Sequence, residues 1–374
     1  MNRTIHGLYI HDAMLSRMFH HAPLLRHDAI SMPPAADDSL FNAPTAEAWK
    51  KLILDKSCTN TPLRECLHIN LHDHRASQPT VEELRLKYSR QTAYVVINGI
   101  SALVSEKQQM GQLQSSSINF STCFDALTCW HFTFARPNVR NTHNASQSDV
   151  FLRMITVLWH TVFMELVTNF DILERAVGRD GPDSPTAQHD LDYAHQWANS
   201  KDAERCILHV HALLHSVGLM RLDTEPAIHI PHCLFLAGIA AYSYTRFHRS
   251  SHAVFQDTDG QPNRTPRLGA HDFPEFIKCG IPMPKHLCES THTSSNANGS
   301  SHREIVAECD QYAARNVQNQ SRAHSGAVTG IMFTINDLLQ RIGHWGVARK
   351  YSATLSTLAQ NDGDGDWALI MNGY

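Results

Sequence analysis

The feature that most constrains this fold is an apolar stripe near the middle of the chain, within residues 146–214. Apolar side chains recur there at steps of three and four residues, namely Leu152, Ile155, Trp159, Val162, Leu166, Phe170 and Leu173. That spacing lines one face of an α-helix. Further apolar residues at 151, 154, 158 and 163 widen the stripe. The sequence therefore predicts a helix that is packed on more than one side.

The ends of this helix can also be predicted from the sequence. Ser146 and Asp149 fit a capped start, and Gly178 suits the left-handed conformation that ends a helix. An unbroken helix over 149–177 would be about 40 Å long, at about 1.5 Å per residue, and the pair at 168–169 is the expected kink. A second long helix is predicted from about Ser200 to Gly218, and the intervening residues contain a short helical pattern around Trp197.

Composition narrows the class of protein. The chain has 374 residues, nine cysteines and a net charge of -4, with a mean hydropathy of -0.31. Its longest apolar run, 234–242, is too short to span a membrane, and the first twenty residues do not read as a signal peptide. We therefore expect a soluble, intracellular protein with reduced cysteines, no membrane contact and no sequence-wide attraction to nucleic acid.

The periodicity along the chain predicts an all-α fold, an irregular multi-helix bundle with long central helices. We expect a lead-in segment at 1–44, a helical core at 45–249, a flexible loop at 250–303 and C-terminal helices at 304–374 that pack on the core. Other helices are expected from Thr45 to Ile53, over 81–104 behind a capping box at Thr80 and Glu83, and over 120–134, 231–247, 305–317, 328–342 and from 344 to Leu358.

The sequence offers no recognisable catalytic, cofactor-binding or metal-ligating residues. Phosphate-binding glycine loops, a zinc-protease helix and a nucleophile elbow are all absent from the sequence. The densest metal-like cluster, Cys66 with His68, His72 and His74, is interpreted as a polar loop, because no two cysteines have the spacing of a zinc knuckle. The tail 362–366 is interpreted as an acidic terminus and not as a calcium loop. The 26 histidines are scattered and predict no shared task.

Several segments, taken in order, resemble a known family. They are 158–160 (LWH), 173–182 (LERAVGRDGP), Trp197 and 206–209 (CILH), supported by 25–28, 40–49, 231–235 and 338–347. Together they are similar to the fungal-specific transcription factor domain of xylanolytic-activator type. The resemblance covers most of the chain and leaves 250–303 unmatched.

The resemblance implies an all-helical regulatory domain of a nuclear protein that controls RNA polymerase II transcription. In that family, zinc fingers that bind DNA precede the domain, and this sequence contains none. The expectation is a truncated gene product or a form that has lost its DNA-reading half. Zinc and DNA would then belong only to the absent finger region. This chain would need no cofactor, and its partners would be the transcription machinery or co-regulators. Self-association as a homodimer is left open.

The sequence is also compatible with a second class of function. A helical enzyme or small-molecule-binding protein unrelated to transcription would have a similar composition, because a ligand site between helices leaves no signature in the sequence.

Overall fold

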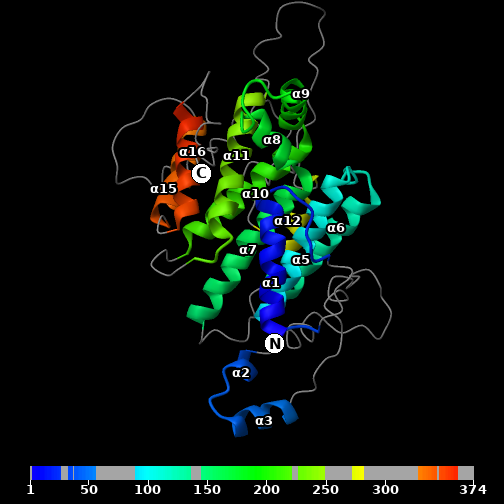
Figure 1. Cartoon of the computed structure of the whole chain (residues 1–374), viewed down its shortest axis with the longest axis vertical. Coiled ribbons are helices and arrows are strands. Elements are labelled where there is room, and N and C mark those ends of the chain that lie inside the picture. Colours follow the sequence, from blue (N-terminus) through cyan, green and yellow to red (C-terminus); the bar gives the residue numbers. More distant parts are fainter. Residues whose placement is uncertain are drawn as a thin grey trace, which may run out of the picture. The chain divides into compact units, whose positions relative to one another are not determined.

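The computed structural model describes residues 2–26, 33–36, 38–55, 89–135, 145–220, 226–248, 272–281, 327–342 and 345–360. Within these ranges every regular element is a helix, so the predicted all-α fold is confirmed (Figure 1). The bounds are α1 Asn2–Met18, α2 Asp38–Phe41, α3 Ala46–Asp55, α5 Arg90–Gln109, α6 Ile118–Trp130, the π-helix η2 His131–Ala135, α7 Ala145–Val167, α8 Phe170–Ala176, α9 Ala187–Ala198, α10 Lys201–Gly218, α11 Ile230–Phe247, α12 Pro274–Cys279, α15 Ala327–Arg341 and α16 Gly346–Gln360.

The chain divides into two compact units, residues Met1–Leu166 and Val167–Tyr374. The division falls near the end of α7, so it coincides with none of the domain boundaries at 44, 249 and 303 that the sequence suggested. Each unit has its own buried residues, and each is described separately below.

In the first unit, α1 packs against α5, α5 packs against α6, and η2 continues α6 directly. Two buried tryptophans tie these helices together through their indole N–H groups. Trp130 donates to the backbone oxygen of Ala93 at 2.9 Å, and Trp159 donates to that of Leu127 at 2.8 Å. Each indole therefore fills core volume and also satisfies its one polar atom.

The apolar stripe predicted around Trp159 is buried as expected. Ile155, Trp159 and Val162 are at most 1 % exposed, and Met154 and Leu158 are buried as well. The helix is interrupted at the expected place, because α7 ends at Val167 and α8 begins after Asn169. The Asn169 side chain accepts a hydrogen bond from the backbone N–H of Ile172, so it caps the new helix.

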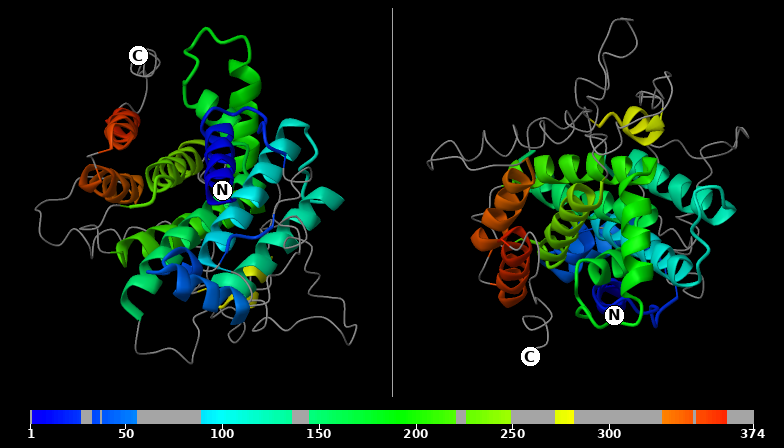
Figure 2. Two further views of the ribbon diagram at one scale, coloured as in Figure 1. Left: turned by 60° about the horizontal axis from the view of Figure 1, so that its bottom comes forward. Right: turned by 90° about the horizontal axis from the view of Figure 1, so that it is seen from above.

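In the second unit, α11 is the most enclosed helix. It packs against α9, α10, α15 and α16, and α15 also packs against α16 (Figure 2). The rings of Phe235 on α11 and Tyr351 on α16 stack with their centroids 4.3 Å apart. At Gly238 a Cβ would lie only 2.6 Å from Leu355 Cδ1, so α11 and α16 approach closely where a glycine stands.

Several predicted helix ends are confirmed. The Ser200 hydroxyl accepts from the Ala203 backbone N–H at the start of α10, which runs to Gly218. Pro231 lies in the first turn of α11. Gly178 follows α8 and has a φ of 108°. Residues other than glycine rarely adopt a positive φ.

Three predictions need correction. The long helix expected to start behind a capping Ser146 begins at Ala145, so Ser146 lies inside α7. The helix expected over 81–104 does not run through Ser89, which is extended and caps α5 from Arg90 onwards. The segment 250–303, expected to be one flexible loop, contains the helix α12. The capping box at Thr80, the helix over 305–317 and the remainder of 250–303 lie outside the described residues.

One helix could cross a membrane on length and composition alone. It is the window Val150–Val167 in α7, with a mean hydropathy of 1.6. Because 72 % of this window is buried inside the protein, its apolar character agrees with the role of a core helix.

Candidate functional site

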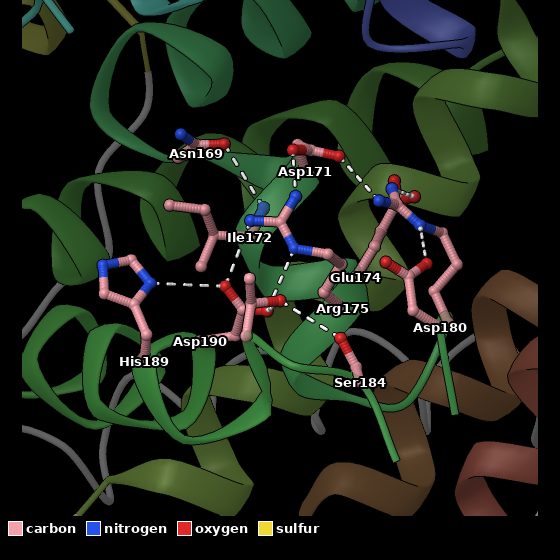
Figure 3. A network of polar contacts seen from close by, with 11 residues as sticks. Asn169, Asp171, Ile172, Glu174, Arg175, Asp180, Ser184, His189 and Asp190 are labelled. Carbon is pink, nitrogen blue, oxygen red and sulfur yellow. Dashed lines mark hydrogen bonds and ion pairs between the residues drawn. The ribbon is translucent and has the colours of Figure 1, made fainter. Parts of the chain in front are cut away.

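Among the described residues of the second unit, a connected polar cluster lies between α8 and α9 (Figure 3). It contains Arg175 and Arg179, four carboxylates, a threonine and a histidine. Glu174, Arg175, Arg179 and Asp180 of this cluster lie within the segment 173–182. Asp171 and Arg175 are four residues apart on α8 and form an ion pair, as neighbours on one helix face can.

Arg175 holds α8 to α9 through Asp190. Its Nε lies 3.0 Å from Asp190 Oδ2, and its Nη2 lies 3.0 Å from Oδ1, so the guanidinium binds the carboxylate with two parallel hydrogen bonds. The Thr186 hydroxyl donates to Asp190 Oδ2 at 2.7 Å. Asp190 is fully buried, yet it is well supplied with donors. Such two-pronged pairs are both strong and directional.

These contacts decide the ionisation of Asp190. Burial works against its charged form, but the hydrogen bonds from Arg175 and Thr186 outweigh burial and lower the pKa of Asp190 below its ordinary value. The carboxylate therefore stays ionised at neutral pH and serves as a fixed acceptor.

Arg179 organises the turn that follows α8. Its Nη2 lies 2.7 Å from Asp171 Oδ1, its Nη1 lies 3.1 Å from Glu174 Oε2, and its Nε lies 3.1 Å from Asp180 Oδ1. Asp171 thus bridges both arginines. The turn itself needs Gly178 and Gly181, both of which have positive φ.

The chemistry of this cluster suits a fixed arrangement of charge. Guanidinium groups remain protonated at any physiological pH, so the two arginines are poor proton donors and acceptors in catalysis. Their donors are directed at carboxylates of the same chain. We therefore interpret the cluster as a brace that holds the α8–α9 turn in one conformation.

The first unit contains a different buried charge, Glu165 on α7. Its Oε1 lies 3.5 Å from Arg17 Nε of α1, and its Oε2 accepts from the Ser101 hydroxyl of α5 at 3.4 Å. Burial raises the pKa of Glu165 to about 7, although Arg17, His20 and Ser101 act in the opposite direction. This carboxyl titrates close to neutral pH and links three helices.

A shallow surface hollow follows one face of α9, with a volume of about 660 Å³, and it is lined by Asp192, His195, Gln196 and Asn199. His195 and Asn199 also contact the backbone oxygen of Phe247 at the end of α11. The hollow is open and is lined by polar side chains, unlike the enclosed apolar sites that bind drug-sized ligands.

Among the residues that the structure describes, no three His, Cys, Asp or Glu side chains are grouped so that they could hold a metal ion. His209 is fully buried and His211 is partly exposed, so the two imidazoles lie on different faces of α10. The cluster from Cys66 to His74 and the tail 362–366 lie outside the described residues.

In the sequence, Glu174, Arg175 and Arg179 stand out only as part of a segment that resembles a family, and the sequence does not indicate which residues they contact. The spacing of Asp171 and Arg175 was a readable signal for their ion pair. The pairing of Arg175 with Asp190 had no such signal, since the two residues lie on different helices.

Comparison with protein-family models, with curated proteins and with solved structures found no match to this chain.

Proposed function

We propose that this chain is the regulatory region of a fungal RNA polymerase II transcription factor, acting in the nucleus without reading DNA itself. The proposal is supported by the order of the segments that resemble the xylanolytic-activator type of domain and by the all-α fold that such a domain requires.

One observation supports this proposal above the others. The segment 173–182, one of those that carry the resemblance, supplies Glu174, Arg175, Arg179 and Asp180, which together with Asp171 and Asp190 fix a turn between helices. Each charged residue of this network depends on the others, so the segment acts as one structural unit.

A reporter assay tests the proposal. The full chain is fused behind a heterologous DNA-binding domain and expressed in a fungal cell, and transcription from a promoter bearing the matching site is measured. We expect the fusion to change reporter output relative to the DNA-binding domain alone. The Asp190→Asn fusion should lose this effect, because removing one partner of a buried ion pair costs about 3–5 kcal/mol.

Asp192→Asn is the matched control, since it makes the same change on the same helix at an exposed position. It should leave the output unchanged, because surface substitutions usually change stability by no more than about 0.5 kcal/mol. A silent wild-type fusion that is expressed, folded and nuclear would contradict the proposal.

A further inference from the structure

Residues 272–281 form a short segment that lies against α10. Its helix α12 starts directly after Phe273, with Pro274 at the first position, where a missing N–H costs nothing. It ends at Gly280, which has a φ of 66° and therefore the left-handed conformation that closes a helix. Both ends of α12 are thus encoded within the segment itself.

The apolar half of the contact is a small cluster of four residues. Phe273 and Phe276 from the segment bury themselves with Leu208 and Ala212 of α10, and Ile281 packs against the same cluster. Both phenylalanines are only 1 % exposed. Burying two aromatic side chains is the main source of favourable free energy in a contact of this size.

The polar half matches acidic groups of the segment to basic groups of α10. Lys201 Nζ lies 3.0 Å from Asp272 Oδ1, and Arg205 Nε lies 2.8 Å from Glu275 Oε1. Arg205 Nη2 also donates to the backbone oxygen of Asp272 at 2.9 Å. Arg205 therefore binds the segment at both a side chain and the backbone.

The two patterns are ordered along their elements. On α10, Lys201, Arg205, Leu208 and Ala212 follow one another at steps of four, three and four, so they form one stripe that is basic first and apolar after. On the segment, the order acidic–aromatic occurs twice, at 272–273 and at 275–276. The ten residues 272–281 thus include every acidic and aromatic group described above that contacts α10.

The segment and α10 are far apart in the sequence. The ion pairs of Lys201 with Asp272 and of Arg205 with Glu275 join residues that are 71 and 70 positions apart. Side-chain contacts and not sequence proximity therefore bring the segment to α10.

We propose that the stripe of Lys201, Arg205, Leu208 and Ala212 on α10 is a binding surface for acidic–aromatic peptides, and that residues 272–281 are its intramolecular ligand, able to leave and be replaced by a peptide of the same pattern. The phenylalanines supply affinity. The ion pair of Arg205 with Glu275, whose side chains are 15 % and 0 % exposed, supplies selectivity, because a buried pair gains little over its hydrated ions but penalises a peptide of the wrong charge. The proposal does not depend on the transcriptional assignment.

The first test uses a fluorescent synthetic peptide that covers residues 272–281, with Ser in place of Cys279, and fluorescence anisotropy with the full-length chain. A chain carrying Phe273→Ala and Phe276→Ala has a weakened internal ligand and should bind the peptide. Wild-type chain should bind it at least about tenfold more weakly, because the tethered segment competes at a high effective concentration.

Three controls define the recognition. Adding Arg205→Ala to the double variant should weaken peptide binding at least about tenfold, since it removes a charged partner of Glu275 and of the peptide backbone. A peptide with Asp272→Asn and Glu275→Gln should bind as weakly. A chain with Ile277→Ala, an apolar change on α12 at a 54 % exposed position, should behave as wild type.

The second test uses unmodified chain, so it does not depend on a variant that folds. Cys279 of α12 and Cys206 and Cys233 of α10 and α11 are all buried thiols. If the segment leaves as a unit, Cys279 should react with a thiol reagent at least about tenfold faster than the other two, and amides of 276–281 should exchange faster than those of α10. Mass spectrometry of peptides measures both rates.

Equal labelling and exchange of α12 and α10 would overturn the proposal, because the segment would then open only when the second unit unfolds. Rapid opening without peptide binding by the double variant would overturn it also, since α10 would then be no peptide site. The proposal is supported if the double variant binds the peptide and Cys279 is labelled faster than Cys206 and Cys233. Where limited access of the thiol reagent obscures the labelling rates, the peptide measurement is decisive.

Discussion

At the scale of single residues, Trp159 and Glu165 show that burial affects stability differently for an apolar and for an ionisable side chain. Both lie on α7. Trp159 is fully buried, donates its indole N–H to Leu127 and contacts the ring of Phe163 with centroids 4.7 Å apart. Glu165 is also buried, but it carries a group that would be charged in water. An apolar ring gains from leaving water, whereas a carboxylate loses its hydration.

Replacing Trp159 with Ala should therefore lower the free energy of unfolding by about 3–5 kcal/mol, through lost burial and a cavity that the neighbouring side chains only partly fill. Chemical denaturation followed by circular dichroism measures the change. Trp49→Ala is the matched control, because Trp49 of α3 is 47 % exposed and its loss should cost no more than about 1 kcal/mol. Equal losses for the two variants would show that Trp159 does not lie in a packed core.

Glu165 should make stability depend on pH in a specific window. The unfolded chain has an ordinary carboxyl pKa near 4.5, whereas burial raises the pKa of Glu165 to about 7 in the folded chain. Between these values the folded state retains a proton that the unfolded state has released. This contribution to stability is present below about pH 4.5 and is lost as the pH rises through about 7.

Comparing wild type with Glu165→Gln isolates this effect, because other titrating groups cancel in the difference. The stability of wild type relative to the variant should fall by about 2–3 kcal/mol between pH 5 and pH 8, at about 1.4 kcal/mol per unit of pKa difference. Urea denaturation at several pH values measures it. Glu47→Gln makes the same substitution at an exposed position and is the control for the substitution itself. If the stability difference between wild type and Glu165→Gln did not change with pH, the pKa of Glu165 in the folded chain would be ordinary.

At the scale of elements, local signals in the sequence predicted helix ends better than helix extents. The caps at Asn169 and Ser200 and the first-turn Pro231 act through neighbouring backbone atoms, so they are readable without knowing the fold. The predicted start near residue 81 was wrong, since α5 begins at Arg90. The apolar periodicity continues on both sides of Ser89 and therefore suggested one unbroken helix. The six-residue helix α12 was missed because it is too short to show a period, and its phenylalanines are buried by another helix.

The close approach of α11 and α16 gives a prediction at the same scale. Gly238→Ala places a Cβ 2.6 Å from Leu355 Cδ1, and Leu355 is itself only 1 % exposed. We expect a net loss of about 1 kcal/mol, since crowding of about 1–3 kcal/mol exceeds the gain of up to about 1 kcal/mol that Ala brings to a helix.

Gly7→Ala in α1 is the matched control for this prediction. A Cβ at Gly7 meets nothing within 4 Å, so the same substitution should raise stability by up to about 1 kcal/mol. Thermal unfolding of both variants measures whether each substitution raises or lowers stability. Stabilisation by Gly238→Ala would show that the space between α11 and α16 accommodates a methyl group.

At the scale of the whole molecule, the balance of charge predicts how the free chain behaves with nucleic acid. Its net charge is -4 with histidines neutral, whereas binding to the DNA backbone needs an excess of Lys and Arg to displace counterions. The free chain should bind duplex DNA no more tightly than non-specific proteins do, with a dissociation constant of about 10⁻⁴ M or weaker at physiological salt.

A salt titration with labelled duplexes measures this affinity, and competition by unrelated sequences measures discrimination. All duplexes should compete equally. A preference of about 10³-fold or more for one sequence would reveal a DNA-reading element that the charge balance conceals.

The sequence by itself determined that this protein is helical, where most of its long helices begin and end, and that the stripe through Trp159 is buried, because period, caps and breakers act over a few neighbouring residues. Only the tertiary structure decided which helices meet. Arg175 with Asp190, Arg17 with Glu165, and Arg205 with Glu275 are pairs between different helices, the last separated by some seventy residues. The pKa of Glu165 and the position of α12 depend on such pairs, since solvation and charge at one residue are set by whatever the fold brings beside it.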